Sequence, residues 1–239
     1  MPGHVFAFSD RCGGVSTGHF AEANLSLRVG DDPASVSENR QRLLDSLGLP
    51  RHRLLTTRQV HGATVVRVSA NVLDVSPEPA GLPVDADGMV TTARGVALLI
   101  GAADCVPLVL VDADTVGVLH IGWRGLLHGI VEAGMDAMVQ AGARPASTRA
   151  VLGPAIGPCH YPVSEDLRDR LTSRYVAAGA VTLAGAPAVD LPGATAQALA
   201  ELGVAAAVRS DTCTYESSVH FSSRRDGSTG CQGGVVALL

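Results

Sequence analysis

The chain has 239 residues and a formal net charge of −5, and all 18 of its basic residues are arginine because the sequence contains no lysine. This composition excludes the clustered basic excess of a nucleic-acid-binding surface, and it excludes the lysine chemistry of Schiff bases and P-loops. Any anionic substrate must therefore be bound by arginine or by backbone N–H groups.

Length and composition favour one domain over residues 1–239, with a core of alanine, valine and leucine, because aromatic residues make up only 3% of the chain. The N-terminal segment lacks the pattern of a secretion signal, and no apolar run reaches the roughly 20 residues of a membrane helix. The five cysteines are widely spaced and indicate reduced thiols rather than a disulfide framework. We expect a soluble, cytoplasmic monomer or homodimer that binds neither nucleic acid nor membrane.

The first third of the chain predicts alternating strands and helices. In order, the patterns indicate a strand from Val5, a glycine-rich loop with Arg11, a helix from Pro33 to Leu47, two strands between Leu54 and Val68, and a polar loop from Asn71 to Pro83. Asp32 is the expected N-cap of the helix, and Gly48 ends it. His61 interrupts the strand pair, and Asp87 follows in an Asp-Gly sequence that is typical of turns.

The centre of the chain predicts a β-hairpin. Val106 to Val111 and Val116 to Ile121 are rich in β-branched residues, and the four residues between them have turn composition. A centred turn places Cys105 opposite Gly122, so Cys105 and His120 become diagonal neighbours, roughly 7–8 Å apart at the backbone. A thiolate and an imidazole in this arrangement can share a metal ion.

Cys105 taken alone would more often be inert core filling, because free cysteine is among the most buried residue types. Its pairing with His120, beside the ionisable Asp104 and Arg124, favours a functional site, since ionisable groups at strand ends need partners or solvent. His61 is the best candidate for a third partner because it also lies at a strand end within an apolar context.

The second half predicts further helices and strands. They are an amphipathic helix from Leu126 to Val139, a strand from Thr148 to Leu152, a helix capped by Ser164, a helix from Pro192 to Leu202, and strands from Val204 to Val208 and from Val235 to Leu239. Two glycines and two prolines precede Cys159 and His160. Because adjacent side chains seldom face each other, we interpret that segment as a rigid loop rather than a nucleophilic pair. Arg224 and Arg225 are the densest positive charge, for which solvated surface arginines are the simplest interpretation.

Eight motifs in chain order resemble the YfiH-type laccase-domain family, once called polyphenol oxidase or multicopper oxidase and now described as purine nucleoside phosphorylase. They are Arg11-Cys-Gly-Gly-Val-Ser, Asn24-Leu-Ser, Gln59-Val-His-Gly, Ala86-Asp-Gly, Ala103-Asp-Cys-Val-Pro, His120-Ile-Gly-Trp-Arg-Gly, Gly153-Pro-Ala-Ile-Gly and Phe221-Ser-Ser-Arg-Arg-Asp-Gly-Ser-Thr-Gly. The chain departs from the family pattern at Cys231, where arginine is usual, and at Val219-His220-Phe221, where another aromatic residue is common.

The resemblance implies an α+β fold, a mixed α/β sandwich of two sheets flanked by helices, and a zinc ion held by His61, Cys105 and His120. Three protein ligands leave a coordination position open, which is typical of catalytic zinc. Zinc is favoured over copper because a laccase needs several histidine-rich copper centres, and this chain has eight scattered histidines. The expected partners are a purine nucleoside and phosphate.

Two reactions fit such substrates. In deamination, an activated water attacks the purine C6, and Asp87 or Asp104 would transfer protons. In phosphorolysis, phosphate attacks the anomeric carbon of the ribose. We expect Arg11, Arg124 and Arg225 to line one cleft, with Arg124 acting in catalysis and Arg11, Asn24 and Arg225 binding substrate. The sequence does not rank the reactions, so we expect activity on adenosine, inosine and methylthioadenosine.

Two other classes of function remain open. A cysteine hydrolase acting on a peptidoglycan precursor would use Cys105 as nucleophile and His120 as base, because some family members are described as peptidoglycan-editing factors. A non-catalytic binding module would show no turnover of any nucleoside.

Overall fold

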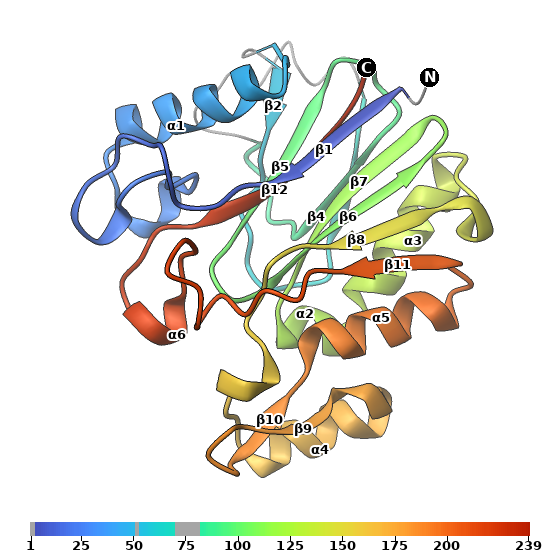
Figure 1. Cartoon of the computed structure of the whole chain (residues 1–239). Coiled ribbons are helices and arrows are strands. Elements are labelled where there is room, and N and C mark those ends of the chain that lie inside the picture. The colour runs from blue at the N-terminus through green and yellow to red at the C-terminus, as the bar shows by residue number, and fades with distance from the viewer. Residues whose placement is uncertain (1–2, 51–52, 70–81) are drawn as a thin grey trace.

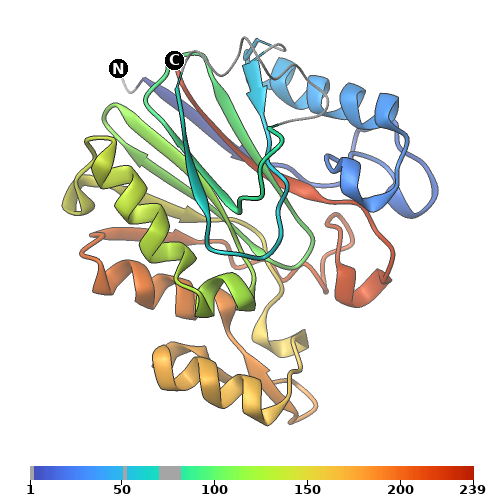
Figure 2. The same ribbon diagram turned by 180° about the vertical axis from the view of Figure 1, so that it is seen from behind.

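The computed structural model describes residues 3–50, 53–69 and 82–239, which form four layers (Figures 1 and 2). Helix α1 covers a four-stranded sheet, which packs on a six-stranded sheet, and helices α3 and α5 cover the far side. A small pair of strands, β9 and β10, lies with helix α4 at one end of the molecule (Figure 1). The expected sandwich of two sheets flanked by helices is confirmed.

The sheets combine strands from distant parts of the chain. The four-stranded sheet has the order β1 (His4–Phe8), β12 (Gln232–Leu238), β5 (Ala97–Ala102) and β2 (Leu54–Leu55). The six-stranded sheet has the order β11 (Ala206–Arg209), β8 (Arg149–Leu152), β6 (Val106–Asp112), β7 (Thr115–Ile121), β4 (Gly88–Thr91) and β3 (Val65–Val68). The third sheet pairs β9 (Gly179–Val181) with β10 (Pro187–Val189).

The helices are short, and three of them, α1, α3 and α5, cover the outer faces of the two large sheets. In chain order, the helices are α1 (Pro33–Ser46), α2 (Trp123–Leu127), α3 (Ile130–Gln140), α4 (Glu165–Arg174), α5 (Leu191–Glu201) and α6 (Ser223–Asp226). Single 3-10 turns are η1 (Gly18–Phe20), η2 (Leu27–Val29), η5 (Pro145–Ser147), η6 (Pro158–His160) and η7 (Val176–Ala178). In the described part of the chain, none of the helices is long and apolar enough to cross a bilayer.

Strand β12 shows why the central strands carry almost no polar side chains. Val235 and Ala237 pack with α1, whereas Val236 and Leu238 pack against the six-stranded sheet. Alternate side chains point to opposite faces of a strand, so a strand between two apolar layers needs small apolar residues on both faces. The alanine, valine and leucine core expected from the composition is the result.

The central hairpin has the predicted register. Val106 of β6 pairs with Ile121 of β7, and Pro107 pairs with His120. Continuing this register by one residue places Cys105 opposite Gly122, as the centred turn requires. The helix caps predicted at Asp32 and Ser164 are also present, because each side chain accepts a hydrogen bond from a backbone N–H of the first turn.

Three predictions need correction. The helix expected from Leu126 to Val139 is two helices, because Gly129 adopts a left-handed conformation with φ of 83° between them. Asp87 does not lie in the turn predicted from its Asp-Gly sequence, because Gly88 is the first residue of β4 and the Asp87 side chain is buried. Cys159 and His160 face each other within η6, with 3.2 Å between Sγ and Nδ1.

The remaining elements lie close to their predicted positions. The two strands expected between Leu54 and Val68 are present as β2 and β3, but both are shorter than that range. The C-terminal strand begins three residues earlier than predicted, and it pairs with β1, so that His4 lies opposite Leu238 (Figure 1). Most of the loop predicted from Asn71 to Pro83 lies outside the described residues.

The contact between α3 and β7 generates a stability prediction. A methyl group added at Gly134 would lie 2.4 Å from Leu119 Cδ1, and one at Gly88 would lie 2.4 Å from Leu119 Cδ2. Leu119 therefore fills space that two glycines leave open. We expect Gly134→Ala to lower the free energy of unfolding by about 1–2 kcal/mol, although alanine is the better helix former by about 1 kcal/mol.

The matched control is Asp136→Ala, which introduces the same residue on the exposed face of α3. It should change the unfolding free energy by less than about 0.5 kcal/mol. Urea unfolding followed by circular dichroism measures both, and a Gly134→Ala protein as stable as the control would contradict the packing argument.

Candidate metal centre

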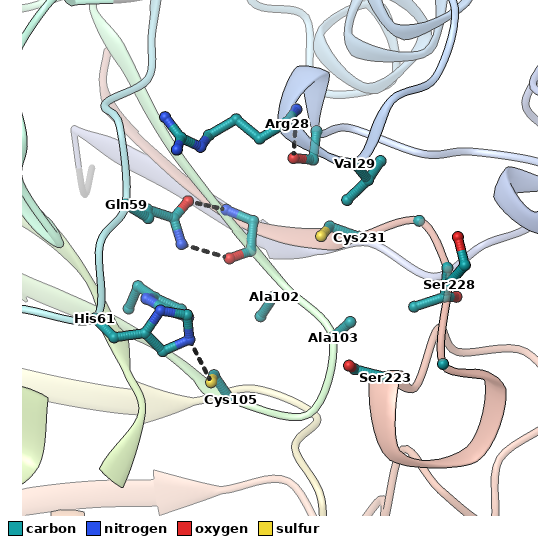
Figure 3. A pocket seen from close by; sticks show the side chains of 16 residues that line it. Arg28, Val29, Gln59, His61, Ala102, Ala103, Cys105, Ser223, Ser228 and Cys231 are labelled. Atoms are coloured by element: carbon teal, nitrogen blue, oxygen red, sulfur yellow. Dashed lines mark hydrogen bonds between the residues drawn. The ribbon is translucent and has the colours of Figure 1, made fainter. Parts of the chain in front are cut away.

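His61, Cys105 and His120 converge although they come from three separate segments of the chain. Figure 3 shows the side chains of His61 and Cys105 pointing toward each other. Their potential ligand atoms all lie within 4.8 Å of one another, and Cys105 Sγ lies 3.8 Å from His61 Nε2. The two imidazole rings are nearly perpendicular, with centroids 4.8 Å apart and an interplanar angle of 78°. Tetrahedral bonds of about 2.3 Å to sulfur and 2.0 Å to nitrogen put sulfur and nitrogen about 3.5 Å apart and the two nitrogens about 3.3 Å apart. The three residues therefore fit one metal ion with one position left open.

The backbone at this centre is tightly constrained. His61 has a φ of 60°, and Asp104, which precedes Cys105, has a φ of 88°. Such left-handed conformations are costly for residues with a side chain and occur where surrounding contacts enforce them, often at functional sites. Gly122 is required for space, because a Cβ there would lie 2.8 Å from His61 Cδ2 and 3.2 Å from Cys105 Sγ.

Asp87 holds both histidines in place. Its fully buried carboxylate accepts hydrogen bonds from the backbone N–H groups of Val60, His61 and Gly62, at 3.1, 2.9 and 2.7 Å. The same carboxylate is 2.8 Å from His120 Nδ1. That contact leaves Nε2 of His120 free to face Cys105, which is how a carboxylate orients a metal-binding histidine.

The charges of the centre support one another. Burial by itself would raise the pKa of the Cys105 thiol, but the nearby His120 and the hydrogen bonds from His120 and His61 bring this pKa well below its usual value. Burial would lower the pKa of His120, but Cys105 and Asp87 raise it above its usual value. Cys105 is therefore prepared to act as a thiolate, the form that binds metals and attacks electrophiles.

The cluster opens into a cavity of about 380 Å³ (Figure 3). Its walls come from the η2 turn with Ser26 and Arg28, from Gln59, from residues 101–103 and 105, and from residues 223 and 227–231. Gln59 is fixed in the wall because its amide both donates to and accepts from the backbone of Gly101, at 2.7 and 2.8 Å. A cavity of this volume with a few fixed polar groups is typical of a small-molecule site.

The structure does not bring the three predicted arginines into this cavity. The Arg225 guanidinium donates to the carbonyl groups of residues 214, 215, 217 and 220 and to Asp226. Arg11 donates to the carbonyl of Ala21 and stacks over Phe221, and Arg124 stacks over Trp123 at the start of α2. Within the described residues, Arg28 is the one arginine in the cavity wall.

Asn24 and Asp104 lie behind the cavity wall. The Asn24 side chain is fully buried, and its oxygen accepts from the backbone N–H groups of Ser26 and Cys231, which line the cavity from two sides. The Asp104 carboxylate accepts from the Thr214 hydroxyl and from the Arg224 backbone N–H, both at 2.7 Å. The hydrogen bonds of both side chains therefore connect separate loops.

Sequence reasoning missed Arg28 and Gln59 as cavity residues. Gln59 belongs to the motif that contains His61, and Arg28 follows the Asn24-Leu-Ser motif by two residues. Their proximity to these motifs could have identified both as cavity residues.

Comparison with known proteins decides the family. A family model described as "Multi-copper polyphenol oxidoreductase laccase" matches residues 5–239. The chain belongs to this laccase-like family. The resemblance noted in the sequence is thereby confirmed.

Relatives cover the chain almost completely. A purine nucleoside phosphorylase of Streptomyces griseus is 43% identical over 98% of this chain and 94% of its own length. One of Corynebacterium glutamicum is 36% identical over 97% and 93%. The crystal structure of YlmD from Geobacillus stearothermophilus matches with a TM-score of 0.89 at 34% identity, over 99% of this chain and 92% of that one. YfiH from Bacillus licheniformis matches with a TM-score of 0.87 at 28% identity, over 99% and 93%.

The family name mentions copper, whereas the donor set of this member, one thiolate and two imidazoles, suits either copper or zinc. The structure thus supports a metal-binding cluster at His61, Cys105 and His120 without choosing the metal.

The crowding at Gly122 generates a prediction about metal binding. We expect Gly122→Ala to displace His61 and weaken metal binding at least tenfold, because the added methyl group has no space beside the two ligands. Gly62→Ala is the matched control, since its Cβ would meet its nearest neighbours at 3.5 and 3.6 Å. Competition with a chromophoric chelator measures both affinities. Equal affinities in the two variants would refute the proposed geometry.

Proposed function

We propose that this protein is a zinc-dependent purine nucleoside phosphorylase acting on adenosine, inosine and methylthioadenosine, with adenosine deaminase as a second activity. The observation that carries the proposal is the open cluster of Cys105, His61 and His120 beside a cavity of about 380 Å³. Its relatives bear the name purine nucleoside phosphorylase and span almost the whole chain. We further propose that residues 1–239 act as one catalytic domain.

His61, Cys105 and His120 would hold the zinc ion, and Asp87 would orient the imidazole of His120 and position the backbone of His61. When bound, zinc would supply Lewis acidity to a substrate oxygen or to water at its open position. We favour zinc because a single cluster of one thiolate and two imidazoles lacks the several copper centres that laccase chemistry requires.

Arg28 is our candidate for the phosphate-binding residue. In phosphorolysis an oxygen of phosphate forms a bond to C1′ of the ribose while the glycosidic bond breaks, and the base leaves with the bonding electrons. The reaction needs a cation that positions phosphate beside the sugar. Arg28 fits this role because it lines the cavity and the chain contains no lysine.

The residues behind the cavity wall would hold the loops that form this wall and would not contact the substrate. Asn24 would fix Ser26 and Cys231, Asp104 would fix the loop before Cys105, and Arg225 would fix residues 214–220. Arg11 would support Phe221, and Arg124 stays a candidate only for an interaction at the outer surface.

One observation favours a second candidate function. Cys105, His120 and Asp87 are arranged like the nucleophile, base and orienting carboxylate of a cysteine hydrolase. Burial would raise the pKa of the Cys105 thiol, but His120 and His61 have the larger effect and lower it. This arrangement would serve a cysteine hydrolase acting on a peptidoglycan precursor. A cytoplasmic location fits either function, because all five cysteines are free thiols.

Product analysis on adenosine, with and without phosphate, tests the main proposal. Adenine and ribose 1-phosphate formed only with phosphate indicate phosphorolysis, whereas inosine formed without phosphate indicates deamination. A chelator should abolish both. Turnover that survives chelation, together with a covalently trapped Cys105, would favour the cysteine hydrolase, and no turnover of any nucleoside would favour a binding module.

We expect Cys105→Ala to lose one equivalent of zinc and all nucleoside turnover while the protein remains folded. The hairpin is held by its apolar neighbours, so losing one small side chain should cost about 1–3 kcal/mol of unfolding free energy. The control is Cys12→Ala at an exposed position, which should retain metal and activity. A Cys105→Ala protein that keeps its zinc but has no activity would identify Cys105 as a nucleophile.

We expect Arg28→Ala to raise KM for phosphate by about 10–100-fold and to leave zinc content unchanged, because a hydrogen bond to a charged group contributes about 1.5–3 kcal/mol. Arg170→Ala removes an arginine from helix α4, which does not line the cavity, and should leave KM unchanged. Initial rates at varied phosphate concentration measure both. An unaltered KM in the Arg28 variant would assign phosphate binding to other groups.

A further inference from the structure

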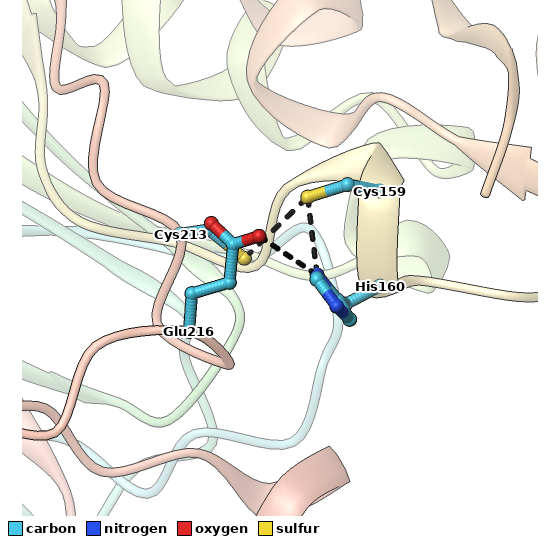
Figure 4. A group of neighbouring side chains, drawn as sticks. All are labelled: Cys159, His160, Cys213 and Glu216. Atoms are coloured by element: carbon cyan, nitrogen blue, oxygen red, sulfur yellow. Dashed lines mark hydrogen bonds and ion pairs between the residues drawn. The ribbon is translucent and has the colours of Figure 1, made fainter. Parts of the chain in front are cut away.

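A second group of metal-binding side chains lies outside the cavity. Cys159 and His160 come from the η6 turn, and Cys213 and Glu216 come from the turn that follows β11 (Figure 4). Their donor atoms lie within 4.8 Å of one another. Cys213 is buried, Cys159 and His160 are partly buried, and Glu216 closes the group on the solvent side.

The distances within this group match the edges of a tetrahedron around one zinc ion. Bonds of about 2.3 Å to sulfur and 2.0 Å to nitrogen or oxygen require edges of about 3.8 Å between two sulfurs and about 3.3–3.6 Å for the mixed pairs. The structure has 3.8 Å between the two Sγ atoms and 3.2 Å between Cys159 Sγ and His160 Nδ1. His160 Nδ1 lies 3.5 Å from the Glu216 carboxylate.

The local backbone is built for close approach of the two sulfurs. A Cβ at Gly157 would lie 3.0 Å from Cys159 Sγ and 3.4 Å from Cys213 Sγ. The Gly157 N–H donates a hydrogen bond to Cys213 Sγ at 3.2 Å, so the backbone of the first loop holds this sulfur next to Cys159. The carbonyl of Cys213 accepts hydrogen bonds from the N–H groups of Glu216 and Ser217, so this turn returns Glu216 to the cysteine three residues before it.

We propose that Cys159, His160, Cys213 and Glu216 form a second, structural zinc site, which is distinct from the cluster in the cavity. Four protein ligands complete a tetrahedral shell, which distinguishes this site from the three-ligand centre. Two thiolates, an imidazole and a carboxylate are a donor set that zinc accepts.

The site joins the two loops that support the catalytic centre. Ile156, in the first loop, donates its N–H to the carbonyl of Asp104, and Thr214, in the second, donates its hydroxyl to the Asp104 carboxylate. Asp104 directly precedes Cys105. A zinc ion between Cys159 and Cys213 would therefore stabilise the backbone that presents Cys105.

A disulfide is the competing use of the two cysteines. It needs sulfurs about 2.0 Å apart, whereas these lie 3.8 Å apart and each also faces a further polar group. The test must therefore count free thiols as well as metal.

The experiment uses Cys105→Ser, which removes a ligand of the cavity cluster and leaves the second site as the expected tight site. We expect this variant to retain about one zinc per chain, and its Co²⁺ form to show sulfur-to-cobalt charge-transfer absorption. Saturating zinc should raise its unfolding temperature by on the order of 10 °C. Adding Cys159→Ser should abolish all three signals, whereas adding the control Cys12→Ser should abolish none.

If the double variant with Cys159→Ser does not fold, Glu216→Gln in the Cys105→Ser background replaces it in the test. Glu216 is exposed, so this variant should fold, and we expect its zinc affinity to be at least tenfold weaker. The proposal is overturned if Cys105→Ser protein binds no zinc, if Glu216→Gln leaves the affinity unchanged, or if thiol titration under non-reducing conditions finds two thiols fewer than the four remaining cysteines. These results are independent of nucleoside turnover, so they stand apart from the proposed function.

Discussion

The hydrogen bonds of the buried Asp87 carboxylate are the interactions on which the geometry of the candidate metal centre depends. It accepts hydrogen bonds from three consecutive N–H groups at residues 60–62 and binds the ring of His120, so one side chain determines the positions of two ligands from different segments. A buried charge needs such partners, because an unpaired carboxylate in an apolar core would be very costly. Asp87 keeps its charge here because burial, which raises its pKa, is outweighed by His120 and the backbone donors.

Buried polar side chains also hold the rest of the site together, because their hydrogen bonds connect loops that belong to neither sheet. Asn24 connects Ser26 to Cys231, and Asp104 connects the loop before Cys105 to Thr214 and Arg224. The two sheets form the support: His120 lies in β7, while His61 and Cys105 lie on loops at the sheet edges, as is common for binding sites. The positive φ values of His61 and Asp104 show that tertiary contacts override local preference where ligands are presented.

The sequence predicted correctly the features that depend on residues near one another in the chain, namely the hairpin register and the helix caps. The turn between β6 and β7 determined the register that places Cys105 beside His120, because a centred hairpin turn leaves one pairing. The caps at Asp32 and Ser164 were predictable for the same reason. Gly129 misled the helix prediction, because a glycine within a helical pattern is tolerated at a cost of about 1 kcal/mol and its φ cannot be known from sequence.

The amino-acid sequence was enough to predict a lysine-free, alanine- and valine-rich α/β chain with a cysteine and a histidine paired on a hairpin, and its motifs indicated the family. The packing of the sheets was needed to show that Arg28 lies in the cavity wall while Arg11 and Arg225 donate to backbone carbonyls, and that Cys159 meets Cys213, which lies far away in the chain. The physical reason is that the direction of a long or buried polar side chain follows from the donors and acceptors around it. Those groups come from distant segments and are brought together only when the sheets pack.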